Sequence, residues 1–217
     1  VIGVFSLRGG VGVSTLAVNL AASLAQIWSV QAALVDLSFL SGEAALLLNL
    51  PLRNTWSDLA TMPIEEIEDE LIDSVLLAHP AGVRVLAAPR RIDQSELITA
   101  DKVNRVLGYL KKRYPYIVLD LPHDFQATTL AGLDAADVVI GMLSPELAAV
   151  RSTASMLDVF DTLEYPREKT QLVLNWIFEK RGLARKDIEN ALKHSIRVVI
   201  PFASEVFVPA INLGVPP

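Results

Sequence analysis

Short apolar runs alternate with stretches of helical periodicity along most of the chain. Val1–Ser6 is a continuous apolar run, typical of a strand that is buried on both faces. Between Ser14 and Trp28 apolar side chains recur at the three- and four-residue spacing of a helix, at Leu16, Leu20, Leu24 and Ile27. The pattern therefore predicts a strand that leads through a short loop into an amphipathic helix.

The same alternation continues to the end of the chain. Further runs of the buried-strand type are Ala32–Ser38, Tyr116–Pro122, Ala136–Ser144, Thr170–Trp176 and Ser195–Pro201. Two shorter strands are expected within Ser74–Pro89, on either side of the turn Pro80-Ala81-Gly82. Helices are predicted in a stretch ending at Arg113 and at Pro145–Leu163 and Leu183–Lys193. Such alternation predicts an α/β fold, a doubly wound and mostly parallel sheet with helices on both faces.

Composition narrows the class of protein and of site. Hydrophobic residues make up 52% of the chain and charged residues 20%, which excludes a disordered protein. The absence of cysteine excludes disulfides, thiolate metal sites and cysteine nucleophiles, and the three histidines lack ligand spacing. The net charge of −6 argues against broad affinity for DNA. No apolar run reaches the roughly 18–20 residues that span a bilayer.

Two charged stretches stand out from this background. Glu65–Asp73, "EEIEDELID", is predicted to be a helix with a solvated acidic face over a packed apolar face, and no function is assigned to it. Glu179–Arg197 holds six Lys or Arg against three acids, which fits a solvated helix face or a DNA-binding patch. Because the chain starts directly in a strand and shows no repeat or linker, we expect one domain, 1–217, from a longer protein.

Polar side chains follow several of the predicted strands. Ligands of doubly wound sheets bind outside the carboxyl ends of the strands, so these side chains are the candidates for a site. They are Arg8, Asp36, Asp120, Ser144 and Asn175.

The loop after the first strand carries the strongest local signal. In "FSLRGGVGVST" the glycines Gly9, Gly10 and Gly12 permit positive φ and let backbone N–H groups approach an anion. The helix that follows adds the positive end of its dipole, and a Ser or Thr at its start can cap it and also hold Mg²⁺ through its hydroxyl. The alternative is a tight strand–helix connection without a ligand.

The chain resembles the ParA/MinD family of dimeric ATPases in this loop and in several segments that follow it. "RGGVGVST" is similar to the family's deviant Walker A loop K-G-G-x-G-K-[ST], and "YIVLDLP" resembles its Walker B strand. Further similar segments are "LVDLSFLSGEAALLL", "SPELAAVRSTASMLDVF", "LVLNW" and "VVIPFASEVFVPAINLGVPP". The resemblance implies a P-loop NTPase fold of the SIMIBI type, with ATP or ADP and Mg²⁺ as cofactors.

Two positions depart from the family's loop. Arg8 stands at the signature lysine, which in the family reaches across the dimer to the partner's nucleotide, and a solvated loop arginine is the alternative. Val13 stands at the phosphate-loop lysine. Losing one charged hydrogen bond costs about 1.5–3 kcal/mol, whereas a cation on the transferring phosphoryl group is worth on the order of 10³–10⁵ in rate. We therefore expect that nucleotide binding survives and that hydrolysis is weak or lost.

Other roles follow from the resemblance. Asp36 corresponds to the catalytic Asp near the attacking water, the second acid of that pair is replaced by Ser38, and Asp120 and Ser14 correspond to the Mg²⁺ site. Asn175 corresponds to the adenine contact, with Pro201 and Phe202 beside the base. For Asp36 and Asn175, a paired strand-end acid and a turn former are the alternatives. The backbone of Gly9, Gly10, Val11, Gly12, Val13, Ser14 and Thr15 is expected to cradle the phosphates.

Within the family the chain looks most like the CpaE/TadZ branch, which assists assembly and localisation of type IV (Flp/Tad) pili. This resemblance implies a nucleotide-dependent homodimer with pilus or secretion proteins as partners, in the cytoplasm and at a pole or the membrane surface. An N-terminal receiver-like domain and a membrane-anchoring helix stay open. The alternatives are an active partitioning ATPase and a nucleotide-free scaffold.

Overall fold

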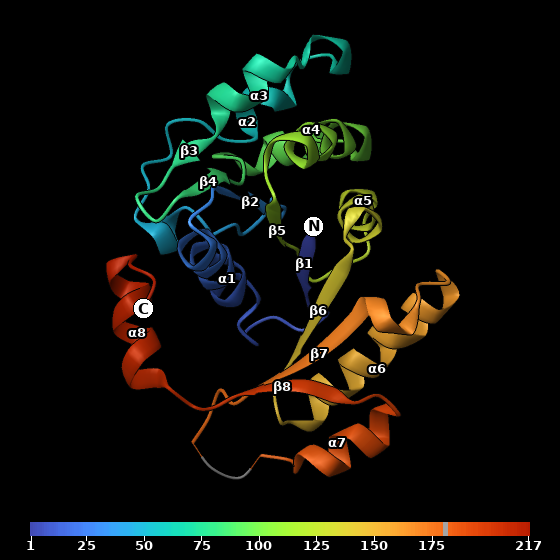
Figure 1. Cartoon of the computed structure of the whole chain (residues 1–217). Helices are drawn as coiled ribbons and strands as arrows, with labels where there is room; N and C mark the ends of the chain where they lie inside the picture. Colours follow the sequence, from blue (N-terminus) through green and yellow to red (C-terminus); the bar gives the residue numbers. More distant parts are fainter. Residues whose placement is uncertain (180–181) are drawn as a thin grey trace.

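The computed structural model describes residues 1–179 and 182–217, and within these ranges eight strands form one sheet. Their order across the sheet is β3-β4-β2-β5-β1-β6-β7-β8 (Figure 1). The strands are β1 (Ile2–Phe5), β2 (Ala32–Asp36), β3 (Leu77–Ala78), β4 (Val83–Leu86), β5 (Tyr116–Asp120), β6 (Val138–Leu143), β7 (Thr170–Asn175) and β8 (Ile196–Ile200). Every neighbouring pair is parallel except β3 and β4, which form the hairpin expected around Pro80-Ala81-Gly82.

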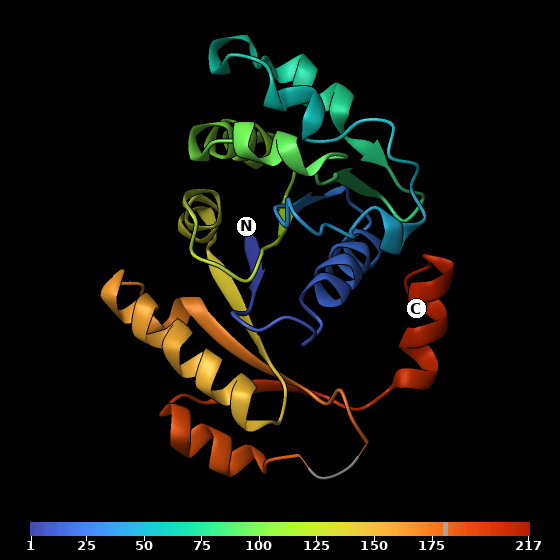
Figure 2. The same cartoon turned by 180° about the vertical axis from the view of Figure 1, so that it is seen from behind.

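Helices cover both faces of this sheet, as Figures 1 and 2 show from opposite sides. The α-helices are α1 (Val13–Trp28), α2 (Ser57–Ala60), α3 (Asp69–Val75), α4 (Ala100–Arg113), α5 (Ala127–Ala135), α6 (Leu147–Thr162), α7 (Arg185–Leu192) and α8 (Ser204–Leu213). The short 3₁₀ helices are η1 (Leu46–Leu48), η2 (Ile64–Glu66), η3 (Ile92–Leu97) and η4 (Arg167–Lys169).

Alternating residues of the central strands supply two separate apolar cores. Successive side chains of a strand point to opposite faces, and so Val35 and Leu119 join a core with α4, α5 and α6. Leu34 and Val118 join a second core that packs under α1. The doubly wound, mostly parallel α/β fold is therefore confirmed.

The acidic stretch 65–73 is not one helix, which corrects the prediction. The chain is helical at η2 and again at α3, and between them Ile67 and Glu68 have non-helical ψ angles of 81° and 164°. Ile67 and Ile72 are both buried. In a continuous helix they would point about 140° apart, and the break lets both reach the same core.

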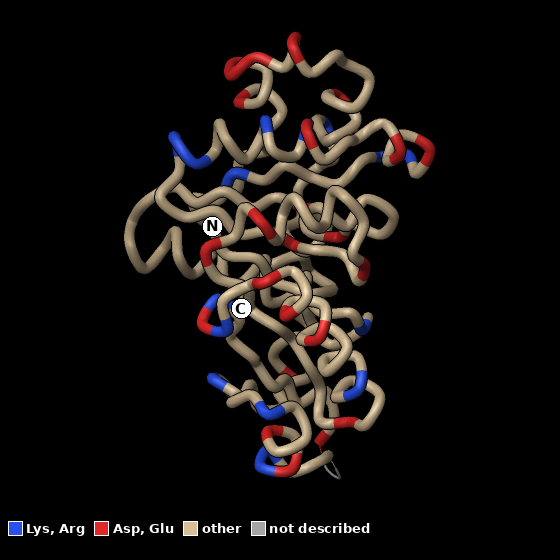
Figure 3. Tube along the Cα trace, turned by 90° about the vertical axis from the view of Figure 1, so that its right-hand side faces the viewer, with Lys and Arg blue, Asp and Glu red and all other residues tan. Residues whose placement is uncertain are grey.

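Charged residues are unevenly distributed over the molecule. Figure 3 shows Asp and Glu gathered at the end that holds η2 and α3, where Glu65, Glu66 and Glu70 are exposed, while Lys and Arg are scattered. Of the basic stretch that begins at Glu179, Lys180 and Arg181 lie outside the described residues. No helix in the described ranges is long and apolar enough to cross a bilayer.

Candidate functional site

The polar strand ends singled out in the sequence lie along one edge of the sheet. Asp36, Asp120, Ser144 and Asn175 end or follow β2, β5, β6 and β7, and Arg8 follows β1. These strands are consecutive in the order β2-β5-β1-β6-β7. Parallel pairing brings all their carboxyl ends to the same side. The polar side chains that the sequence predicts at the carboxyl ends of the strands therefore lie along one edge of the sheet.

The glycine loop between β1 and α1 leaves the start of the helix open. Gly10 and Gly12 have φ of 79° and 97°, in the region that disfavours side chains. Gly12 is the N-cap of α1, no side chain caps this end, and the first turn carries no acidic residue. The first backbone hydrogen bond of the helix runs from Leu16 N to Gly12 O, so the N–H groups before it are available to an anion.

Val13, at the position of the family's lysine, is a core residue. Its side chain is 4% exposed and belongs to the apolar cluster that contains Val11, Ala17 and Met142. Hydrophobic packing thus replaces a charge at the first residue of α1.

Two carboxyl groups are buried side by side where β2 and β5 end. Asp36 and Asp120 are register partners across the two parallel strands. Asp36 accepts hydrogen bonds from the backbone N–H groups of Ser38 (3.0 Å) and Ala44 (3.1 Å). Both side-chain oxygens of Asp120 are buried without a hydrogen-bond partner among the described residues.

Burial governs the protonation of this pair. Loss of hydration raises the pKa of Asp36 to about 7, opposed by the backbone hydrogen bonds from Ala44 and Ser38. Burial raises the pKa of Asp120 well above its ordinary value, the charge of Asp36 adds to this, and the Ser14 hydroxyl lowers it. Without a cation the site therefore favours a neutral form of at least one carboxyl group.

These groups fit a magnesium ion only in company with phosphate. Mg²⁺ is usually held by one or two carboxylates together with waters and substrate phosphates. The oxygens of Asp120 and the nearby hydroxyl of Ser14 fit this type of Mg²⁺ coordination. In the part of the chain that is described, no cluster of three or more Asp, Glu, His or Cys is placed to hold a metal alone.

Gly42 fixes the backbone against the buried carboxyl group of Asp36. A Cβ atom at Gly42 would lie 2.6 Å from Oδ2 of Asp36 and 2.2 Å from Cβ of Ala88. We expect Gly42→Ala to lower the free energy of unfolding by about 2–4 kcal/mol, because the clash is with packed atoms. Urea denaturation measures this, and Gly108→Ala is the control.

Gly108 lies inside α4, and a Cβ there meets nothing within 4 Å. Gly108→Ala is expected to raise stability by about 0.5–1 kcal/mol, because alanine favours helix. Equal effects of the two substitutions would contradict the packing role of Gly42.

Arg8 is held within its own chain. Nε of Arg8 donates to Oε1 of Glu146 at 2.6 Å. The side chain of Arg8 is 40% exposed and that of Glu146 is 32% exposed. This pair replaces the freely solvated loop arginine that was the alternative. Whether Arg8 reaches a second copy stays a prediction. On the neighbouring strand, the hydroxyl of Ser144 is buried and has no partner among the described residues.

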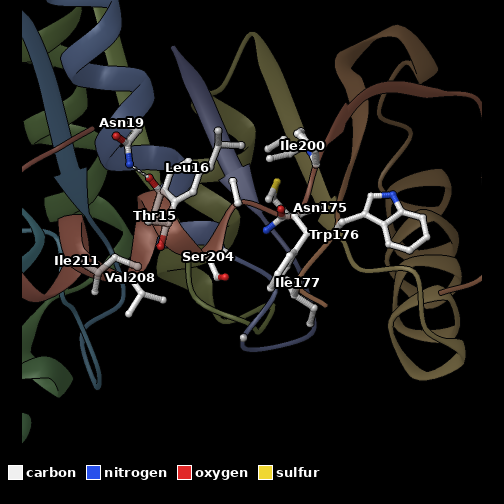
Figure 4. Close-up of a pocket in the computed structure, with 17 residues that line it drawn as sticks. Thr15, Leu16, Asn19, Asn175, Trp176, Ile177, Ile200, Ser204, Val208 and Ile211 are labelled. Atoms are coloured by element: carbon white, nitrogen blue, oxygen red, sulfur yellow. Dashed lines mark hydrogen bonds between the residues drawn. The ribbon is translucent and has the colours of Figure 1, made fainter. Parts of the chain in front are cut away.

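A pocket of about 400 Å³ lies beside the loop, between α1, the ends of β7 and β8, and α8 (Figure 4). It brings together several residues predicted for the site: Gly10, Gly12, Thr15, Asn175, Pro201 and Phe202. The other predicted site residues lie outside the pocket lining: Arg8, Gly9, Val11, Val13, Ser14, Asp36 and Asp120. The pocket is mostly apolar and open to the loop, as a flat heterocyclic ring would require.

Asn175 links this pocket to the loop. Its Nδ2 donates to the carbonyl of Val11 at 3.0 Å, which leaves Oδ1 as the acceptor for a ligand. A Cβ on Gly12 would come within 2.8 Å of Nδ2. Asn175 is therefore an anchor of the loop as well as a pocket residue.

Sequence reasoning missed the part of the pocket that α8 supplies. Phe207, Val208 and Ile211 line its wall, and Ser204 supplies a hydroxyl. Figure 4 shows Ser204, Val208 and Ile211 on the ribbon of α8, across from Thr15 and Asn19 on α1. The apolar composition of residues 204–213 was the available signal. Sequence reasoning also missed His123, which contacts the loop, because its spacing from the other histidines gives no signal of a role.

Comparison with known proteins gives a consistent result. A family model for an AAA domain matches residues 1–173. The chromosome partitioning protein ParA of Myxococcus xanthus is 30% identical over 213 residues, covering 89% of this chain and 72% of that protein. The septum site-determining protein MinD of Thermotoga maritima is 24% identical over 222 residues, covering 100% of this chain and 80% of MinD.

Solved structures share the fold. The crystal structure of a ParA family ATPase from Chlorobium tepidum superposes with a TM-score of 0.89 at 20% identity, covering 98% of this chain and 88% of that one. MinD from Pyrococcus horikoshii, complexed with Mg-ADP, gives a TM-score of 0.83 at 19% identity, with 99% and 86% covered.

Proposed function

This chain belongs to the ParA/MinD family of P-loop ATPases, and from that membership we propose that it binds ATP together with Mg²⁺. The open N-terminus of α1 and the glycine loop receive the phosphates. The base enters the pocket at Asn175, Pro201 and Phe202. A structure of the related MinD from Pyrococcus horikoshii holds Mg-ADP, which supports the choice of ligand.

The buried carboxyl pair is the observation that carries this proposal. An ionised carboxyl group at Asp120, buried without a hydrogen-bond partner among the described residues, is unfavourable unless a cation compensates its charge. Mg²⁺ brought in with the nucleotide supplies that cation, and the hydroxyl of Ser14 completes its protein ligands. Asp36 lies beside it as its register partner, and in this proposal it orients a water molecule toward the terminal phosphate.

Nucleotide then acts as a switch rather than as a fast-turnover substrate. The backbone and the helix dipole contribute to binding without a lysine, so affinity survives the apolar Val13. Hydrolysis is weak or absent because no lysine neutralises the charge that develops on the transferring phosphate. Two subunits associate over the bound ATP, with Arg8 released from Glu146 to contact the second copy.

The biological task that we propose is to position or assist assembly of a type IV (Flp/Tad) pilus, as in the CpaE/TadZ branch. The degenerate loop, with Arg8 and Val13 in place of two lysines, supports this choice. The second candidate is an active partitioning ATPase, favoured by the 30% identity to ParA of Myxococcus xanthus. Deletion of the gene in its native host separates them, because loss of pili supports the first and chromosome missegregation supports the second.

Equilibrium binding of ATP, with and without Mg²⁺, tests the proposal. We expect micromolar affinity that depends on Mg²⁺. Gly12→Ala should weaken binding at least about tenfold, because it strains a positive φ and displaces Asn175. Gly108→Ala, far from the loop in α4, is the matched control and should bind normally. No binding at millimolar ATP would leave a nucleotide-free scaffold.

Sedimentation of the protein with ATP and Mg²⁺ tests the switch. We expect a shift from monomer to dimer that Arg8→Ala abolishes while monomer binding of ATP is kept. A sedimentation coefficient that ATP does not change would contradict the dimerising role.

A further inference from the structure

The ring of His123 lies against the start of the glycine loop. Nδ1 of His123 is 2.7 Å from the carbonyl oxygen of Ser6, at the end of β1. The opposite edge of the ring faces Gly9, where an added Cβ would lie 3.5 Å from both Cδ2 and Nε2. The side chain is otherwise exposed. His123 is thus held by one nitrogen and presents the other to the loop.

The contact with Ser6 assigns the two ring nitrogens. A carbonyl oxygen only accepts hydrogen bonds, so Nδ1 of His123 must be the donor. Nε2 is then the nitrogen left to contact a ligand, and when it also carries a proton it is a charged donor directed at the loop.

The position of the ring along the loop identifies the phosphate that it meets. The base pocket is lined by Gly10, Gly12 and Asn175, at the helix end of the loop, and His123 does not line it. Gly9 comes directly before Gly10, on the side of the loop toward β1, and it is outside the pocket lining. A phosphate chain that starts at the pocket and extends over the loop away from Asn175 would approach Gly9 and His123 with its distal end.

Among the described residues, little other positive charge is free to meet that phosphate. Val13 is apolar, and in the single chain Arg8 is paired with Glu146, from which it is released only on association with a second copy. The remaining charged groups around His123 are acidic: Asp36, Asp120 and Asp124, together with Glu96, which lines the same cavity as His123. Mg²⁺ offsets the first two in the proposed complex, and Asp124 accepts hydrogen bonds from Gln126 N and Thr129 Oγ1.

We propose that Nε2 of His123 donates a charged hydrogen bond to the γ-phosphate of bound ATP and supplies the positive charge that Val13 lacks. This inference rests on the proposed function and deepens it. In the complex the ring carries both protons, because the carbonyl of Ser6 and the phosphate are both acceptors. ATP is then distinguished from ADP by a contact that only the γ-phosphate makes.

Binding constants of His123 variants for ATP and ADP test this role. At pH 6.5, His123→Ala should weaken Mg·ATP about tenfold or more, the usual loss for a charged hydrogen bond. Mg·ADP should change by less than about twofold. His123→Arg should restore ATP affinity and keep it at pH 8.5, where the advantage of wild type over His123→Ala should shrink. His194→Ala, which precedes the amino end of β8, is the control.

NMR titration of the imidazole signals gives an independent readout. At pH 6.5 ATP, but not ADP, should move the His123 ring signals toward those of the doubly protonated imidazole, and the signals of His79 and His194 should not change. Equal loss of ATP and ADP affinity in His123→Ala would overturn the proposal in favour of a structural role. Normal ATP affinity in that variant would also overturn it while leaving the proposed function intact. Failure of the wild type to bind either nucleotide would overturn both.

Discussion

Asp120→Asn is expected to stabilise the nucleotide-free protein and at the same time to remove most of its Mg²⁺-dependent affinity for ATP. The carboxyl group of Asp120 is buried with both oxygens unpartnered among the described residues, next to the carboxyl group of Asp36. An amide of the same shape carries no charge into the interior. We expect the free energy of unfolding at pH 8 to rise by about 2–4 kcal/mol, measured by urea denaturation.

The gain should depend on pH, and its sign follows from the raised pKa values. An unfolded Asp ionises near pH 4, whereas burial raises the pKa of Asp36 to about 7 and that of Asp120 well above its ordinary value. Between these pH values the folded state binds more protons than the unfolded state, so wild-type stability falls as pH rises from about 4 through 7. Asp120→Asn removes one of the two groups, and its stability should fall less steeply.

Two comparisons make the prediction specific. Asp161→Asn, on the exposed face of α6, is the matched control and should change stability by less than about 0.5 kcal/mol. Saturating Mg·ATP should stabilise the wild type and leave Asp120→Asn nearly unchanged. A variant that is less stable than wild type at pH 8, or one that binds Mg·ATP normally, would contradict the assignment of Asp120 as a magnesium ligand.

Much of the fold is predictable because most of its strands are buried on both faces. The run Tyr116–Pro122 is mostly apolar without alternation, and it begins where β5 begins and ends two residues beyond it. The buried strand predicted at Ser195–Pro201 is wrong in its burial, because β8 lies at the edge of the sheet and exposes Val198 and Val199. The break between η2 and α3 is not predictable in this way. Ile67 and Ile72 fit one amphipathic helix in outline, and only the position of the core decides that both are buried.

The site is predictable where the chemistry lies in local sequence and not where it depends on packing. Asp36 and Asp120 follow buried strands, and the sheet order places them together. The second role of Asn175, its hydrogen bond to the loop, joins residues far apart in the chain. The ring of His123 is likewise held by the carbonyl of Ser6, and no pattern in the sequence predicts this contact.

Val13→Lys is expected to give the largest functional change of any single substitution. A lysine at the first residue of α1 adds a charged hydrogen bond to the phosphates, which should tighten Mg·ATP binding about 10–150-fold. The same charge would meet the phosphoryl group in transfer, where a cation is worth on the order of 10³–10⁵ in rate. Measurable ATP turnover should therefore appear, in contrast to the weak or absent turnover that we propose for the wild type.

The substitution should also lower the stability of the nucleotide-free protein. Val13 is 4% exposed among Val11, Ala17 and Met142, so a lysine must turn its stem along the loop to reach water. We expect a loss of about 1–3 kcal/mol that Mg·ATP reverses, because the phosphates then pair with the charge.

Val13→Met separates the effect of charge from that of size. Methionine adds comparable length and no charge, so it should change stability a little and ATP affinity hardly at all. Isothermal titration and a phosphate-release assay on the three proteins measure both quantities. If the lysine and methionine variants bound Mg·ATP with the same affinity, the phosphates would not lie at the N-terminus of α1. The absence of a lysine at Val13 would then not explain weak hydrolysis. If lysine restored affinity but not turnover, the missing catalytic element would instead be the acid that Ser38 replaces beside Asp36.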